Sequence, residues 1–177
     1  MLPDLEDLLL DTDLNPEIQP YLEAVGFHIQ FALHVDANER DDLDLLRWAR
    51  RHGFIYVCHD RFRDRDTKLR IYPDLYENGG KILRIAGDSS QDPLTAVGKV
   101  LVDREKWKAW FGDNDGIVIV RANNKPIYHH ADALFARIER LLPSDDPDRR
   151  LRHRRPGRER LRPRTREKPG EQQRLMS

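Results

Sequence analysis

The sequence contains a single cysteine, Cys58, among its 177 residues. One thiol cannot form an intramolecular disulfide framework or a cysteine zinc site, so an apolar core has to hold the fold together. A chain without disulfides is typical of a reducing compartment, and the cytoplasm is the location we expect.

Long apolar runs are also absent. The sequence has no stretch of 18 consecutive apolar residues. Residues 1–7 are acidic and lack the cationic start and apolar stretch of a secretory signal. We therefore expect neither a membrane span nor a cleaved leader.

The formal net charge of zero conceals two parts of opposite sign. Residues 149–177 hold 12 Lys and Arg against three Glu, a net charge of +9, and residues 1–148 hold the other 19 basic and 28 acidic residues, a net charge of −9. After Pro143 no apolar periodicity survives, so this segment cannot bury enough surface to offset the entropy of ordering. The sequence predicts one domain over 1–143 and a basic, disordered tail over 144–177. The tail either adds non-specific affinity for nucleic acid or only increases solubility.

Apolar strands alternate with helical segments in the predicted domain. We expect strands at 8–10, 27–33, 54–58, 81–85, 116–120 and 126–128, and helices at 15–26, 41–52, 93–111 and 131–142. The charged stretch 59–80 is expected to be irregular, with one helical turn. Helices between successive strands favour right-handed crossovers and a mostly parallel sheet. The predicted fold class is therefore α/β, with a central sheet flanked by helices and a hairpin and helix at its C-terminal end.

Single aspartates stand where these strands end. Asp11 ends the first strand, and Asp13 lies two residues after it. Asp42 begins the helix that leads to the strand 54–58, and Asp60 follows that strand. In an open parallel sheet, ligands bind outside the carboxyl ends of the strands, so three elements bring a carboxylate to one edge. The alternative for each is a local role, as a polar strand end or a helix cap.

Asp42 carries the sharpest local argument. The residues three, four and seven positions after it are apolar and form the predicted buried stripe, so Asp42 points along the edge of the core. Asp41 and Asp44 lie to either side of that stripe and are expected only to complement the helix dipole.

Carboxylates gathered at one edge repel one another and raise each other's pKa unless a cation neutralises them. An all-oxygen site suits Mg²⁺ or Mn²⁺, held by a few carboxylates together with water and substrate phosphate. Such ions serve phosphodiester hydrolysis, which is the chemistry that this edge predicts.

Four segments follow one another along the chain: LLLDTDLN at 8–15, the segment 42–60 ending in GFIYVCHD, GGKILRI, and GIVIV followed by PIYHH. In order and spacing they resemble the small PIN-like domain family of toxin–antitoxin nucleases. The resemblance covers residues 8–130. It implies a PIN-like three-layer fold, an endoribonuclease activity that depends on Mg²⁺ or Mn²⁺, and catalytic acids at Asp11, Asp42 and Asp60. RNA is then the substrate, and an antitoxin protein and a second copy of the chain are candidate partners.

The chain departs from the family pattern at two places. Cys58 stands where the family usually has Thr or Ser, and Phe62 stands where a further Asp usually follows the late acid. Asp64 or Asp66 could fill the missing place after a small shift of the loop. We expect the metal ligands among Asp11, Asp13, Asp42, Asp60 and Asp64. If no acid reaches the place of Phe62, the alternative is a catalytically inactive PIN-like module that binds nucleic acid or protein.

A basic run follows the last of these acids, at Arg61, Arg63, Arg65, Lys68 and Arg70. One interpretation is a solvated loop. The other is a rim that contacts phosphates, which an acidic cleft needs in order to attract RNA.

Deleting residues 149–177 should leave the melting temperature nearly unchanged, because a segment without an apolar face contributes little to folding. Thermal unfolding followed by circular dichroism, with the full-length chain as reference, measures this. A fall of several degrees would show instead that the tail docks on the acidic domain.

Overall fold

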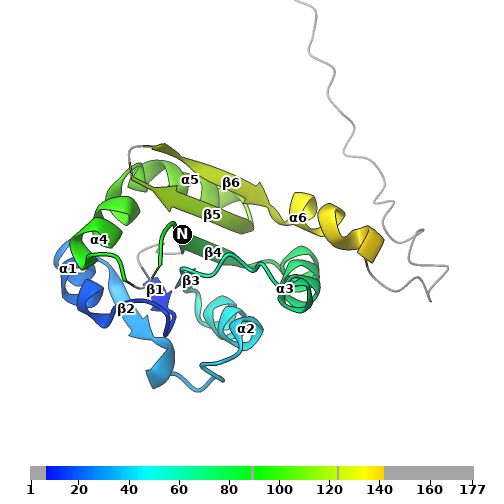
Figure 1. The fold of residues 1–177 in the computed structure, drawn as a ribbon, viewed down its shortest axis with the longest axis horizontal. Coiled ribbons are helices and arrows are strands. Elements are labelled where there is room, and N and C mark those ends of the chain that lie inside the picture. The colour runs from blue at the N-terminus through cyan, green and yellow to red at the C-terminus, as the bar shows by residue number, and fades with distance from the viewer. Residues whose placement is uncertain (1–6, 89, 123, 142–177) are drawn as a thin grey trace, which may run out of the picture. The chain divides into compact units, whose positions relative to one another are not determined.

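The computed structural model describes residues 7–88, 90–122 and 124–141, and the predicted tail over 144–177 lies outside them. Within these ranges the chain has an α/β fold, with one six-stranded sheet between two layers of helices (Figure 1). The strands are β1 (Asp7–Leu10), β2 (His28–Phe31), β3 (Ile55–Cys58), β4 (Lys81–Ile85), β5 (Gly116–Arg121) and β6 (Asn124–His130).

The strands lie in the order β2-β1-β3-β4-β5-β6. All neighbours pair in parallel except β5 and β6, which form an antiparallel hairpin. The predicted mostly parallel sheet with its closing hairpin is confirmed. From β1 the chain first continues outward to β2 and then returns to the other side of β1 at β3. The point where the strand order reverses, which is the usual ligand site of an open α/β sheet, therefore lies between β1 and β3.

Three helices cover each face of the sheet in the described ranges (Figure 1). On one face lie α1 (Gln19–Ala24), α4 (Pro93–Leu101) and α5 (Arg104–Asp113). On the other lie α2 (Asp42–His52), α3 (Arg65–Asn78) and α6 (Ala131–Ile138). Short 3₁₀ turns occur at Pro16–Ile18, Ala32–His34 and Glu139–Leu141. None of the described helices has both the length and the apolar character that crossing a membrane requires.

Helix α2 forms where its capping signals predict it. The Asp41 carboxylate accepts hydrogen bonds from two backbone N–H groups of the first turn, at 3.0 and 3.4 Å. Gly53 ends the helix with a φ of 80°, a left-handed conformation that glycine adopts without strain. The apolar stripe is fully buried, at Leu45, Leu46 and Ala49. This burial holds the first turn, and with it Asp42, beside the ends of the strands.

The prediction of an irregular segment over 59–80 is wrong, because most of it forms the 14-residue helix α3. Asp64 caps this helix by accepting from the backbone N–H of Thr67 at 2.7 Å. Pro73 lies inside the helix, and its missing N–H and ring clash argue against a helix from sequence alone. Tertiary packing overrides that preference, because one side of the helix buries apolar residues in the core shared with α2 and α6, namely Ile71, Tyr72 and Leu75.

The single helix predicted over 93–111 is also wrong. The structure has two helices, α4 and α5, because Asp103 between them adopts a left-handed φ of 55°. The break turns Trp107 into the core on this face, where its indole Nε1 donates to the Val100 carbonyl at 2.8 Å. A buried indole needs such an acceptor, so the break satisfies both the packing and the polarity of Trp107.

A buried carboxylate links α2 and α3. Asp74, whose side chain is 5% exposed, accepts from Arg47 Nε at 3.0 Å and from Arg50 Nη1 at 2.7 Å. Asn78 Nδ2 donates to the same carboxylate at 3.2 Å. This acid is fully engaged by cationic partners and so has a structural role.

Replacing Asp74 by Asn should lower the free energy of unfolding by about 2 kcal/mol, because two arginines lose a buried charged partner. Urea unfolding measures the change. Glu77→Gln is the matched control, since it removes one negative charge from an exposed position of the same helix. It should change stability by less than about 0.5 kcal/mol. Equal losses in the two variants would show that Asp74 contributes no more than surface charge.

Candidate functional site

Four of the five predicted ligands meet at the carboxyl edge of the sheet, the edge where the parallel strands end. Asp11 directly follows β1, and its backbone N–H donates to the Val57 carbonyl of β3 at 2.9 Å. Asp13 lies two residues on, and its carboxylate accepts from the backbone N–H of His59 at 3.1 Å. These two contacts tie the end of β1 to the end of β3, at the point where the strand order reverses.

Asp42 and Asp60 join them from two other segments. Asp42 is the first residue of α2, and Asp60 follows β3 and accepts from the backbone N–H of Phe62 at 2.6 Å. The charges of Asp42 and Asp60 both act on Asp13, and the charges of Asp11 and Asp60 both act on Asp42. We call these four residues the acidic cluster.

Tyr56 is the member of the site that sequence reasoning missed. It lies on β3, is fully buried, and donates from its hydroxyl to Asp42 Oδ1 at 2.7 Å. The same hydroxyl also lowers the pKa of Asp11. A tyrosine within an apolar strand is the signal that could have found it, because a buried phenol needs a polar partner. Tyr56 thus fixes the position of Asp42 and acts on the charge of Asp11.

Burial is the first cause of the raised pKa values in the acidic cluster. It raises the pKa of Asp11 to about 6, and the charge of Asp13 adds to this. Burial also raises the pKa of Asp42 to about 6, with the Tyr56 hydrogen bond opposing and the charges of Asp11 and Asp60 adding. The pKa of Asp13 is raised by burial too. Across the described ranges, none of the four carboxylates forms an ion pair with a basic side chain.

The chemistry of this donor set fits a hard divalent cation. Carboxylates without a basic partner among the described residues are an all-oxygen set of the kind that Mg²⁺ and Mn²⁺ prefer. In the part of the chain that the structure describes, no three His, Cys, Asp or Glu side chains are grouped closely enough to hold a metal ion as they stand. A bound cation would offset the repulsion among these carboxylates, which adds to the raised pKa values of Asp11 and Asp42.

The positions of Phe62 and Asp64 show whether Asp64 supplies the acid that the resemblance implies at the place of Phe62. Phe62 stands where the family pattern has an Asp, and it is 1% exposed, within the core shared by α2, α3 and α6. Asp64 is engaged as the cap of α3 and is fully exposed. The structure therefore brings Asp11, Asp13, Asp42 and Asp60 together and leaves Asp64 out.

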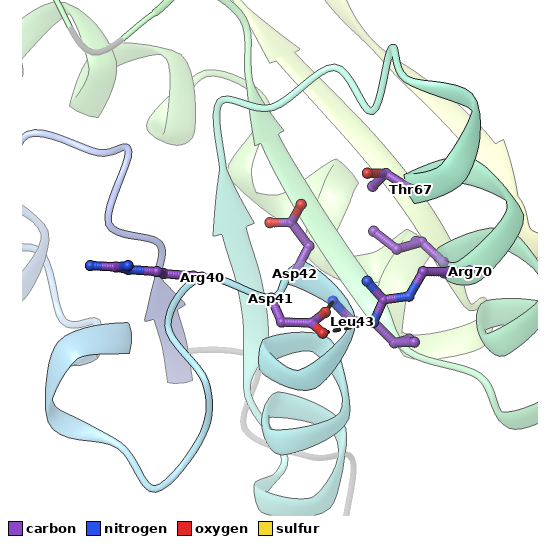
Figure 2. A pocket seen from close by; sticks show the side chains of 7 residues that line it. Arg40, Asp41, Asp42, Leu43, Thr67 and Arg70 are labelled. Atoms are coloured by element: carbon purple, nitrogen blue, oxygen red, sulfur yellow. Dashed lines mark hydrogen bonds and ion pairs between the residues drawn. The ribbon is translucent and has the colours of Figure 1, made fainter.

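A small pocket of about 70 Å³ opens beside Asp42, between the first turns of α2 and α3 (Figure 2). Figure 2 shows the Asp41 carboxylate facing Arg70, with which it forms an ion pair of 2.6 Å, while the Asp42 carboxylate points away from that pair. The pocket has room for only a few water molecules, each of which occupies about 30 Å³ in the liquid. A nucleotide would therefore have to lie outside it, over the carboxyl edge.

The basic run after Asp60 is divided between two elements. Arg61 and Arg63 are exposed in the loop that follows β3, whereas Arg65, Lys68 and Arg70 belong to α3. Of this run, only Arg61 and Arg63 therefore lie outside a helix, and the rim interpretation stays a prediction.

His59 connects the acidic cluster with the loop after β4. Its Nδ1 is hydrogen-bonded to the Ile85 carbonyl at 2.9 Å, so Nδ1 carries the proton. Its Nε2 lies 3.2 Å from Gln91 Nε2 and accepts from it. Burial lowers the pKa of His59, which keeps the ring neutral at neutral pH. A fixed ring in turn fixes the backbone N–H that binds Asp13.

Comparisons with protein-family models, with curated proteins and with solved structures found no match to this chain. Function is therefore inferred from the site, since a fold class alone hosts many activities.

Asp11→Asn should stabilise the protein at neutral pH in the presence of a chelator. The folded pKa of about 6 lies above the ordinary 3.8, so the folded state holds this proton more tightly than the unfolded state. The contribution of this group to the free energy of unfolding is fully present below about pH 3.8 and is lost as the pH rises through about 6. Removing the charge should recover on the order of 2–3 kcal/mol at about pH 7.5. Urea unfolding in EDTA at about pH 4 and about pH 7.5 measures the gain.

Asp44→Asn is the control for this experiment. Asp44 lies in the same turn of α2 as Asp42 and accepts from the backbone N–H of Asn38 at 2.9 Å, a contact that asparagine can keep. This variant should show no gain at either pH. Mn²⁺ should stabilise the wild type at neutral pH more than it stabilises Asp11→Asn. If the stability of the wild type changes neither with pH nor with Mn²⁺, the claim that Asp11 carries a buried, uncompensated charge is refuted.

Proposed function

We propose that this chain is a metal-dependent endoribonuclease that hydrolyses phosphodiester bonds at the acidic cluster. One observation carries the proposal: three separate segments place four carboxylates at the edge where the strand order reverses, without an ion pair among the described residues. Groups with perturbed pKa values that share one cleft are typical of functional sites.

Asp11, Asp42 and Asp60 would hold Mg²⁺ or Mn²⁺, with Asp13 assisting. When bound, such ions supply an activated water and stabilise the oxygens of an in-line phosphoryl displacement. The chain's own residues orient the ligands. Tyr56 holds Asp42 through its hydroxyl, the backbone N–H of Thr12 holds Asp11, and the backbone N–H of His59 holds Asp13.

RNA is the proposed substrate, and a role as the toxin of a toxin–antitoxin pair belongs to the same proposal. The resemblance of residues 8–130 to PIN-like domains supports both. An acidic edge repels a polyanion, so the substrate needs cations nearby. Arg61 and Arg63 are exposed next to Asp60 and can provide them.

Phe62 favours a second candidate function. With Phe62 buried in the place of a further acid, and Asp64 engaged as a helix cap, the cluster has one carboxylate fewer than the family pattern at that position. If the remaining acids do not support hydrolysis, the chain is a PIN-like module that binds nucleic acid or protein without cleaving it.

Cleavage of single-stranded RNA should require Mg²⁺ or Mn²⁺ and should disappear in EDTA. Asp60→Asn should lower kcat/KM at least about 100-fold, because a neutral amide leaves the cations under-neutralised at almost unchanged volume. Asp44→Asn removes the same charge outside the cluster and should stay within about twofold of the wild type, as expected of a surface change. A gel assay with labelled RNA measures both.

Arg63→Ala separates binding from chemistry. It should weaken RNA binding and reduce the magnitude of the slope of log K against log salt by about 0.7, the value for one contact with a single strand. Metal-independent cleavage, or equal losses in Asp44→Asn and Asp60→Asn, would overturn the proposed hydrolysis. Metal binding without cleavage of any RNA would favour the inactive module.

A further inference from the structure

A cationic side chain lies on β4, next to the acidic cluster. Arg84 has Cys58 of β3 and Ile119 of β5 as its register partners. Both partners belong to the core under α2, α3 and α6. Since residues side by side in a parallel sheet point to the same face, Arg84 projects from that face, at the end of β4.

The Arg84 guanidinium has no partner of opposite charge. Among the described residues it makes no hydrogen bond or ion pair, and its Nε is buried and unsatisfied. Unsatisfied buried donors are uncommon in folded proteins and are costly when they belong to a charged group. Arg84 contrasts with Arg50, which is also partly buried but donates to Asp74 at 2.7 Å.

Two further arginines come from elements that adjoin Arg84: Arg61 from the loop after β3, the strand paired with β4, and Arg137 from α6, which covers the same face of the sheet. Arg61 adds a like charge that, after burial, lowers the pKa of Arg84. Arg137 acts together with Arg84 on both Tyr72 and His129. The three arginines come from three separate elements, and we call them the arginine cluster.

Two acids act on the cluster, Asp60 on Arg84 and Asp88 on Arg61, and neither forms an ion pair with it among the described residues. Asp60 stands two residues, roughly 7 Å of extended chain, beyond Cys58, the register partner of Arg84. Uncompensated cations and uncompensated carboxylates thus adjoin each other at the carboxyl edge.

We propose that Arg84, Arg61 and Arg137 form a phosphate-binding site beside Asp60. A guanidinium is a fixed fork of donors that matches two oxygens of a phosphate, and several forks together can bind one dianion or two neighbouring phosphodiesters. His129 and Tyr72 add neutral polar groups at the same place, since burial, Arg137 and Arg84 lower the pKa of His129. Placing a phosphate of the substrate here rests on the proposed nuclease function, whereas the anion site itself does not.

The test uses the full-length protein in EDTA, so that neither metal nor cleavage contributes. Inorganic phosphate at constant ionic strength should raise the melting temperature of the wild type but not that of Arg84→Gln. Binding of a short labelled oligouridylate, followed by fluorescence anisotropy, should weaken at least about tenfold in Arg84→Gln. The slope of log K against log salt should fall in magnitude by about 0.7. Arg84→Lys should recover only part of the affinity, because an ammonium cannot bind two oxygens as a fork.

Arg51→Gln is the matched control. Arg51 is exposed in the last turn of α2, at the opposite edge of the sheet, and its loss changes the net charge equally. It should leave both readouts unchanged. In phosphate-free buffer, Arg84→Gln should melt no lower than the wild type, since it removes an unpaired charge; a clear fall would assign Arg84 a structural role and overturn the site.

The two sources of phosphate give different results. If Arg84→Gln loses the effect of inorganic phosphate and also weakens oligouridylate binding, the site holds a backbone phosphate. If it loses only the effect of inorganic phosphate, the site takes a free phosphate group and the placement of substrate is overturned. If the protein binds phosphate through Arg84 but cleaves no RNA, the proposed nuclease function is refuted and the anion site is supported.

Discussion

The burial of carboxylates that the topology brings to one edge, with the repulsion among them added, is the constraint on which this structure depends. The chain returns past β1 to form β3, so the ends of these two strands adjoin, and each carries acids. Burial prevents water from screening the charges of Asp11 and Asp42, whose pKa values rise to about 6. Tyr56 and the backbone N–H of His59 hold the acids in place at some cost in stability. Such a cost is expected where a site is shaped for a ligand.

Charge is distributed differently in the structural and the candidate functional parts of the molecule. Asp74 is buried and bonded to two arginines, and Asp41 is paired with Arg70 while capping α2. In the acidic cluster and the arginine cluster, by contrast, like charges adjoin and the opposite charges remain unpaired among the described residues. A phosphodiester with its divalent cations complements both clusters. The cations offset the charge of the carboxylates, and the anionic phosphates offset the charge of the arginines.

Local signals predicted most of the fold. The cap at Asp41 and the glycine at Gly53 delimit α2 as expected, and the apolar runs mark the strands. The two errors arose where local preference and packing disagree. Pro73 and many charged residues argue against α3, yet its apolar side is buried by two other helices. The apolar residues of α4 and α5 look like one helix until Asp103 breaks it.

The sequence by itself determined the strands, the helix α2, their alternation and the acids at the strand ends, because each depends on residues close together in the chain. Only the tertiary structure decided which side chains share a site. Strand order and register are set by long-range packing, and they bring Tyr56 to Asp42 and place Arg84 beside Cys58. The same packing buries Phe62, whereas Asp64 caps α3 through a contact only three residues along the chain. Partners that lie far apart in the chain cannot be read from a local pattern, because they meet only once strand order and register are set.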